Sequence, residues 1–152
     1  MRRVIFIVIT LSLLVYTGSL AASSKPLCIV ANFETSGGAS KALSESTAQI
    51  FMTALTYAGD YKVLSYKKQA KAMESINKKK GADISSKDAL ELAAVVEADV
   101  VVTGEIVKSG KSYEVSVTFI DAATGEVIKT GSATHKYQSG ISKSIDDILG
   151  LT

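Results

Sequence analysis

The 152-residue sequence has few of the residues that build reactive or cross-linked sites: one cysteine, one histidine and one proline. A single cysteine, Cys28, excludes a disulfide within the chain, and its position in an apolar run predicts a buried, inert thiol. His135 has no second histidine or cysteine at ligand spacing, which argues against a metal site. The loop at residues 37–41 lacks P-loop spacing, and no G-x-S-x-G elbow occurs. The sequence therefore predicts no catalytic, cofactor or metal site.

The first 22 residues have the parts of an export signal. Arg2 and Arg3 give a positive start, residues 4–15 are almost entirely apolar, and Ser19 and Ala21 fit the small-x-small pattern of a cleavage site. The apolar run is about a dozen residues, whereas a membrane-spanning helix needs roughly 20. We therefore predict a signal peptide over residues 1–22, cleaved after residue 21 or 22, with a retained anchor as the alternative.

Export changes how the charge is interpreted. Of the 17 basic residues, Arg2 and Arg3 leave with the signal peptide, so 15 lysines remain against 15 acidic residues. A neutral chain gives no reason to expect nucleic acid, whose phosphates require a basic surface. Cys28 follows Lys25, Pro26 and Leu27, which is not the context of a lipidation site. We predict a periplasmic protein whose membrane association is only indirect.

Residues 23–152 are expected to form one α/β (α+β) domain. Early strands separated by helices should pair in parallel, and the last three, joined by tight turns, should form an antiparallel meander. The prediction is a mixed five-stranded sheet in the order β-α-β-α-α-β-β-β, with helices packed on it and a short helix at the end. The predicted strands are residues 27–33, 61–64, 99–107, 112–121 and 126–133, and the predicted helices are residues 43–58, 66–80, a third after Ser85, and 140–149.

Three local patterns support this assignment. Ser85 and Asp88 have the spacing of a capping box at a helix start. Residues 112–121 alternate, with apolar side chains on one face and Glu114, Ser116 and Thr118 on the other, so this strand should have one wet face. The helix at residues 66–80 has a weak apolar stripe, which predicts a shallow position on the surface.

Two segments resemble a known family. Residues 97–107 (EADVVVTGEIV), a short turn, and residues 113–127 (YEVSVTFIDAATGEV) are similar to the family that holds the curli secretion channel CsgG, the penicillin-binding-protein activator LpoB and the amino-terminal domain of TolB. The opening strand VANFE at residues 30–34 also matches, and the similarity extends over roughly residues 27–136. The matching motif residues are Ala98, Asp99, Thr103, Gly104, Asp121, Thr124, Gly125 and Glu126.

The resemblance implies an envelope interaction module rather than an enzyme, and it leaves the partner open. Curli-channel subunits are lipidated and add barrel-forming segments, TolB continues into a β-propeller, and the activator has a lipidated tether. This sequence shows none of these features. The implied function is docking on, or regulation of, an envelope assembly or secretion component. One alternative is a self-assembling ring subunit, and another is a small periplasmic hydrolase using Asp121, Glu126 or His135.

Two surfaces are expected to bind a partner. The first is the outer edge of the meander, where an unpaired strand can accept another chain by strand addition. The second is the loop after the first strand together with the basic helix. The helix could attract an acidic partner or anionic lipid and wall polymers, although such a charge run is also typical of a solvated face. The candidate partner-binding residues are Lys67, Lys68, Lys71, Lys78 and Lys79 on the helix, and Glu114, Ser116 and Thr118 on the wet strand face.

Overall fold

The computed structural model describes residues 24–78 and 84–151. The predicted signal peptide, its cleavage site and Lys79 lie outside these residues, so those predictions are not tested by the fold. Within the described part of the chain, no helix is long and apolar enough to span a membrane.

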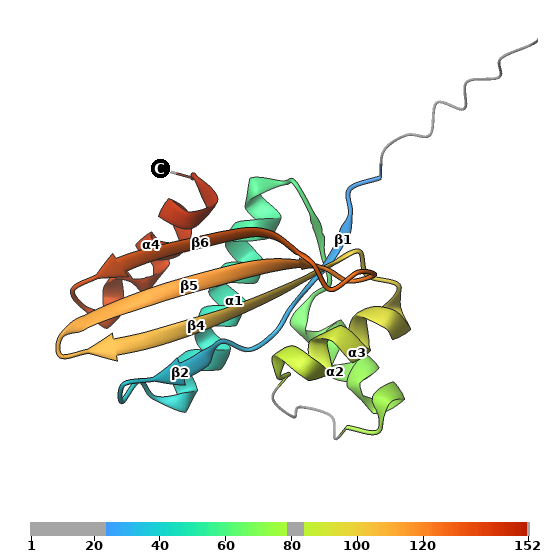
Figure 1. The fold of residues 1–152 in the computed structure, drawn as a ribbon, viewed down its shortest axis with the longest axis horizontal. Helices are drawn as coiled ribbons and strands as arrows, with labels where there is room; N and C mark the ends of the chain where they lie inside the picture. The colour runs from blue at the N-terminus through green and yellow to red at the C-terminus, as the bar shows by residue number, and fades with distance from the viewer. Residues whose placement is uncertain (1–23, 79–83, 152) are drawn as a thin grey trace, which may run out of the picture.

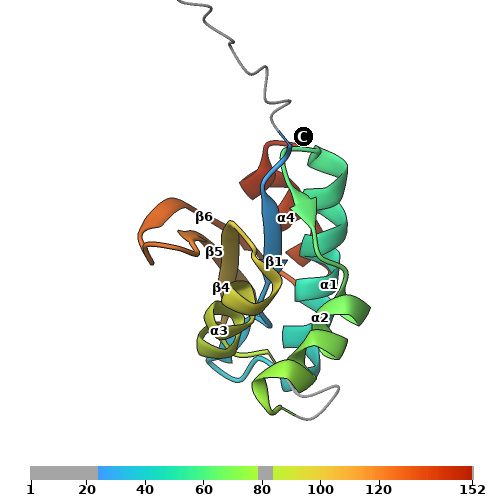
Figure 2. The same cartoon turned by 90° about the vertical axis from the view of Figure 1, so that its right-hand side faces the viewer.

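In residues 24–78 and 84–151, six strands form one mixed sheet, with helices on both sides (Figures 1 and 2). The strands are β1 (Leu27–Val30), β2 (Glu34–Ser36), β3 (Lys62–Val63), β4 (Val100–Ser109), β5 (Ser112–Asp121) and β6 (Val127–His135). The helices are α1 (Lys41–Ala58), α2 (Tyr66–Ala72), α3 (Ser86–Val96) and α4 (Ile141–Leu149), with short 3₁₀ turns η1 (Met73–Ile76) and η2 (Gln138–Gly140).

The strand order is β3-β1-β4-β5-β6, with β2 also paired to β4. β1 pairs in parallel with β3 and β4, whereas β4, β5 and β6 form an antiparallel meander. The mixed α+β class and the meander are therefore confirmed. The predicted count of five strands is wrong, because residues 34–36, expected to be loop, form β2 beside Glu105–Val107 of β4.

The break between β1 and β2 has a clear cause. β1 was expected to continue to residue 33, but it ends at Val30. The amide of Asn32 turns away from the sheet and donates to the carbonyl of Ile84, 2.8 Å away. Phe33 points into the core instead of extending the strand, and the chain returns to β4 only at Glu34. β1 and β2 therefore pair in parallel with two successive parts of β4, residues 100–102 and residues 105–107.

The larger core lies between the sheet and helices α1 and α4 (Figure 2). Phe33, Phe51 and Phe119 form its centre. The ring centroid of Phe51 lies 5.8 Å from that of Phe33 and 6.1 Å from that of Phe119. Burying each such side chain contributes roughly 1.5–3 kcal/mol. The apolar face of β5 supplies Val115, Val117 and Phe119 to this core, which confirms the alternation expected of that strand.

A smaller core lies on the opposite face, where α3 and η1 cover β1 and the beginning of β4. Ser85 caps α3 as predicted, since its Oγ accepts from the Asp88 amide at 3.2 Å. The helix expected over residues 66–80 is shorter: α2 passes into η1, and Asn77 ends the segment in the left-handed conformation. The expected shallow position agrees with the burial: of the seven residues of α2 only Gln69 is buried, and Met73 of η1 is buried beside it.

Candidate partner-binding surfaces

The residues that carried the sequence resemblance build the sheet rather than a reactive site. Asp99 joins the first strand to β4: its Oδ2 accepts from the Leu27 amide at 2.7 Å, and its own amide donates to the Leu27 carbonyl at 2.8 Å. Ala98 is buried beside this junction in the smaller core. The Ala-Asp pair therefore fixes where β1 meets β4.

The D-x-x-TGE segment is the turn between β5 and β6. The Oδ1 atom of Asp121 accepts from the amides of Ala123 (2.9 Å) and Thr124 (2.8 Å) and from the Thr124 hydroxyl (3.1 Å). Gly125 has a φ of 74°, which favours glycine. The bonds from the Thr124 backbone and hydroxyl hold the pKa of Asp121 below its ordinary value. The ionised carboxylate of Asp121 therefore stabilises this turn by accepting its hydrogen bonds.

The residues of the hydrolase alternative do not converge. Asp121 ends β5, whereas His135 lies opposite Tyr113 near the other end of that strand. Eight residues of antiparallel strand separate these points by about 27 Å. His135 instead contacts Asp147 of α4, with Nε2 and Oδ2 3.3 Å apart. This contact links β6 to α4, and nothing brings a nucleophile, base and acid of this set together.

Neither the thiol nor the acids offer another centre. Cys28 is fully buried, as expected, and burial raises the pKa of its thiol to about 12. Such a thiol carries almost no thiolate at neutral pH. Among residues 24–78 and 84–151, no three histidine, cysteine or acidic side chains lie together in a way that could hold a metal ion.

Strand β6 forms the outer edge of the meander, as expected. It pairs with β5, and in the described part of the chain no strand pairs with its other side. A bulge at the start of β6 follows from the register shift beside Phe119 and Ile120. Val127 and Ile128 there are 60% and 52% exposed. A lysine on an edge strand can discourage pairing with another strand. The side chain of Lys129 instead turns toward β5, with its Nζ 5.8 Å from the centroid of the Phe119 ring.

The wet face of the sheet lies beside α3. Among the described residues, no helix covers the parts of β4 and β5 nearer their shared turn on this face (Figure 1). Ser116 and Thr118 pair across the sheet with Glu105 and Thr103, and together they line a shallow polar cavity of about 210 Å³. Glu114 lies farther along the same face, near the β4–β5 turn, and is exposed. The predicted strand residues therefore share one open, uncovered surface.

The predicted basic surface is smaller than the sequence indicated. Lys67, Lys68 and Lys71 of α2 are exposed. Lys78 is engaged with Asp88, whose Oδ1 lies 3.0 Å from its Nζ, and this contact raises the pKa of Lys78 and lowers that of Asp88. Figure 1 places α2 at the end of the molecule away from the β4–β5 turn, so the structure does not join the lysines and Glu114 in one site.

Comparison with known families is decisive for the chain's membership. A family model described as FlgO protein matches residues 17–139. The chain belongs to the FlgO family. A comparison of this FlgO-family sequence with curated proteins gave no match.

Solved structures show the same fold at low sequence identity. The LpoB C-terminal domain from Salmonella enterica matches with a TM-score of 0.64 and 15% identity, covering 74% of this chain and 84% of that one. Lipoprotein GNA1162 from Neisseria meningitidis gives 0.60 and 17%, covering 73% and 80%. A PelC dodecamer from Paraburkholderia phytofirmans gives 0.52 and 20%, covering 83% and 86%. The LpoB part of the predicted resemblance is thus confirmed for the fold, while the CsgG and TolB parts stay predictions.

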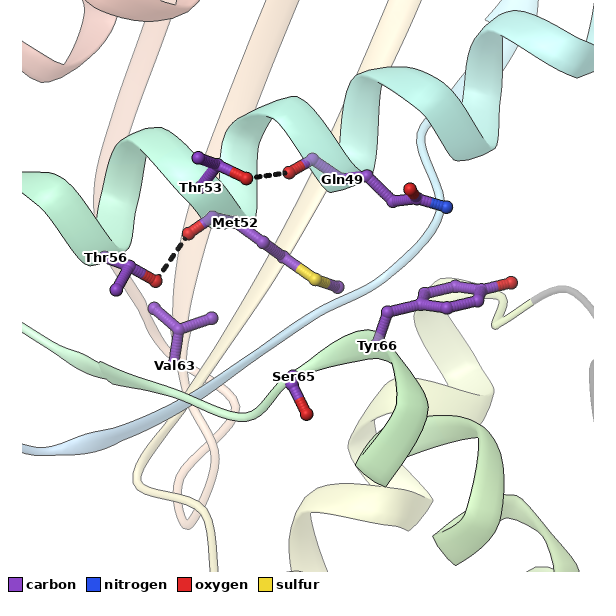
Figure 3. A pocket seen from close by; sticks show the side chains of 7 residues that line it. All are labelled: Gln49, Met52, Thr53, Thr56, Val63, Ser65 and Tyr66. Atoms are coloured by element: carbon purple, nitrogen blue, oxygen red, sulfur yellow. Dashed lines mark hydrogen bonds between the residues drawn. The ribbon is translucent and has the colours of Figure 1, made fainter.

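One surface of the FlgO-family chain was missed from the sequence. The exposed side of α1 carries no charge from residue 46 to residue 59, and Ile50 and Tyr57 on it are 39% and 86% exposed. The 14-residue stretch without charge is the signal that could have found it. A cavity of about 380 Å³ adjoins this helix, lined by Gln49, Met52, Thr53, Thr56, Val63, Ser65 and Tyr66 (Figure 3).

This cavity has no means of catalysis. Its lining holds no carboxylate, imidazole, thiol or amine. Two of its hydroxyls are used within α1, because Thr53 donates to the Gln49 carbonyl at 2.9 Å and Thr56 to the Met52 carbonyl at 2.7 Å (Figure 3).

Proposed function

We propose that this FlgO-family chain is a non-enzymatic, exported protein of the cell envelope that docks on another envelope protein. Its sequence begins with the pattern of an export signal. Structures with the same fold include one titled a lipoprotein, and the sequence resemblance to a penicillin-binding-protein activator points to the same compartment. Asp121 and Glu126 flank one turn, where the Asp121 amide donates to the Glu126 carbonyl, and His135 lies at the far end of the β5–β6 hairpin. The distance of the histidine from both acids supports a binding role over a hydrolytic one.

The observation that carries the proposal is the unpaired edge of β6. An edge strand presents a row of backbone donors and acceptors that another strand can satisfy, and this strand is nine residues long. After the bulge, residues 129–135 pair with β5 in regular register. The adjacent Val127 and Ile128 offer apolar contact beside the pairing edge. We therefore propose that the partner adds a strand along β6.

Site-specific cross-linking tests this surface in living cells. A photoreactive residue is placed at Ser132 of β6, at Lys67 of α2 or at Tyr57 of α1, all exposed positions. We expect a discrete cross-linked product from position 132 and little from the other two. The product should disappear when Val127 and Ile128 are both changed to Asp, and persist when Ile50 and Tyr57 are changed in the same way. A product that forms equally from α1 or α2 would overturn the assignment to β6.

Proline variants test strand pairing itself. In a regular antiparallel strand, neighbouring amides point in opposite directions, so of Ser132 and Ala133 one donates toward β5 and the other toward the open edge. Proline removes one amide donor. Of Ser132→Pro and Ala133→Pro, the one that keeps the wild-type melting temperature has lost the outward amide. For this test the photoreactive residue is moved to Thr130 of β6, which is also exposed and leaves both positions open to proline. The variant that lacks the outward amide should lose the cross-link, and its retention would argue against strand addition.

A second candidate is a ring subunit. It is favoured by the PelC structure, which is a dodecamer with the same fold. In that case the strand added to β6 would come from another copy of this chain. Mass measurement in solution separates the two: a closed assembly of many copies supports the ring, and a monomer or dimer supports docking on a different protein.

A further inference from the structure

The end of the sheet at the β4–β5 turn carries a basic and aromatic cavity that no part of the proposed function uses. The cavity is about 310 Å³ and is lined by Lys108, Gly110, Lys111, Tyr113, Tyr137 and Gln138. We propose that it binds a phosphate group carried by an envelope ligand, either a phospholipid headgroup or a soluble phosphate compound. The inference does not depend on strand addition at β6.

The charges around this cavity have one sign. Two lysines line it, and a third, Lys136, lies beside it with its Nζ 5.9 Å from the centre of the Tyr137 ring. The lining contains no carboxylate. Glu114 follows Tyr113 but lies on the opposite face of β5, and Asp147 is paired with His135. An anion therefore meets ammonium groups here without a competing acid in the lining.

Two of the three lysine side chains, Lys108 and Lys136, lie over aromatic rings. Lys108 extends over the Tyr113 ring, with Nζ 5.8 Å from its centroid, as Lys136 does over Tyr137. Cation–π contacts of this kind are worth about 0.5–1 kcal/mol at exposed sites. They reduce the freedom that these long side chains would lose when an anion binds. The two tyrosine hydroxyls add further donors, which suits a ligand with several acceptor oxygens.

Two helix N-termini add positive potential at the same end of the molecule. The loop before α1 packs so closely on β4 that a Cβ at Gly37 would overlap the Lys108 carbonyl oxygen. Residues Gln138–Gly140 of η2 lead directly from the cavity into α4. Neither α1 nor α4 has an acidic residue in its first turn or a side-chain cap. Both helix dipoles therefore favour an anion there.

The cavity lies far from the point where the chain enters the domain. Cys28 pairs with Val100 at the start of β4, and the cavity lies beyond Ser109 at its end. The nine residue steps from Val100 to Ser109 span about 30 Å. Figure 1 shows the β4–β5 turn at the opposite end from the start of β1.

The test compares two variants that lose the same charge. The first changes Lys108, Lys111 and Lys136 to Gln, and the matched control changes Lys67, Lys68 and Lys71 of α2 to Gln. The chain, exported from an expression host, is titrated with inorganic pyrophosphate by calorimetry, and with vesicles of phosphatidylglycerol and phosphatidylcholine by co-sedimentation. Both variants carry the same N-terminal segment, so any contribution of that segment to vesicle binding cancels.

We expect the wild type and the α2 control to bind a phosphate probe alike, and the first variant to bind about tenfold more weakly or worse, because it loses charge-assisted contacts. Binding to pyrophosphate alone identifies a soluble ligand, and binding only to phosphatidylglycerol vesicles identifies a headgroup; either supports the site. Equal losses in both variants, no binding of either probe, or tighter binding of poly-glutamate than of both probes would overturn it. The Val127→Asp/Ile128→Asp variant should bind phosphate normally, which separates this inference from the proposed function.

Discussion

The ring of Phe33 occupies the space that a side chain at Gly104 would need. A Cβ built on Gly104 would overlap Phe33 Cε1 and Cδ1 and would lie 2.7 Å from Cζ. Gly104 is the glycine of the Thr-Gly pair on β4, and Phe33 belongs to the segment between β1 and β2. The contact explains why the chain can leave the sheet after Val30 and still fill the core, since the ring packs directly on the backbone of β4.

Gly104→Ala is expected to destabilise the fold by about 1–3 kcal/mol, the usual cost of adding a methyl group to a filled core. Urea denaturation measures the change. In a Phe33→Leu background the same substitution should cost less, because the flat ring that it overlaps has been replaced. Equal costs in the two backgrounds would show that the two residues are not coupled.

Ser85→Ala is expected to lower the free energy of unfolding by about 1 kcal/mol, because α3 loses its N-cap. The hydroxyl accepts from the Asp88 amide at 3.2 Å and donates to the Asp88 carboxylate at 2.9 Å. Thermal denaturation measures the loss. Ser85→Asn should restore much of the stability, since asparagine also caps helices and places no second carboxylate beside Asp88. Failure of that rescue would assign the effect to something other than capping.

The turn acceptor Asp121 predicts a pH-dependent stability. Its pKa is lowered from 3.8 in the folded protein by the bonds from Thr124 and Ala123. Its contribution is therefore fully present above the unfolded-state value and is lost as the pH falls below 3.8 through the folded-state pKa. Asp121→Ala should lower the melting temperature at neutral pH, and the gap to wild type should narrow below about pH 4. Asp121→Asn keeps an oxygen acceptor, so its loss should be smaller; a gap independent of pH would contradict the assignment.

The thiol of Cys28 is expected to resist modification in the folded protein. It is fully buried, and its pKa is raised to about 12 by burial. An aromatic disulfide reagent at pH 8 should label it only after urea unfolds the domain, with a rate that follows the unfolded fraction. Rapid labelling without denaturant would show that β1 opens locally.

Patterns within a few residues were sufficient for most elements. The alternation of residues 112–121 gave β5 with its correct faces, and the Ser85 and Asp88 spacing gave the start of α3. The predictions that were wrong concern elements whose formation depends on segments distant in the sequence. Residues 34–36 carry no strand pattern, and they form β2 only because Glu105–Val107 of β4 lies beside them. The sequence predicts a helix over residues 66–80 because its lysines continue past Asn77. In the structure the helical segment ends at Asn77.

The candidate surfaces follow the same division. The sequence placed an exposed edge at the last strand, because three strands joined by short turns leave the third with one neighbour. It also counted Lys78 among the free basic residues, whereas the fold pairs that lysine with Asp88. The cavity at the β4–β5 turn could not be anticipated, since Lys108, Lys111 and Tyr137 meet only when β6 returns past the turn.

The sequence by itself determined the kind of elements, the meander, the unpaired last strand and the absence of reactive residue patterns. Those properties follow from periodicity, turn residues and composition, which act over a few residues. Only the tertiary structure decided that β2 exists, that Phe33 fills the space above Gly104, and that three lysines and two tyrosines gather at one end of the sheet. These depend on contacts between segments up to 71 residues apart, such as Glu34 and Glu105. The pattern within any one segment does not specify which segment will lie beside it.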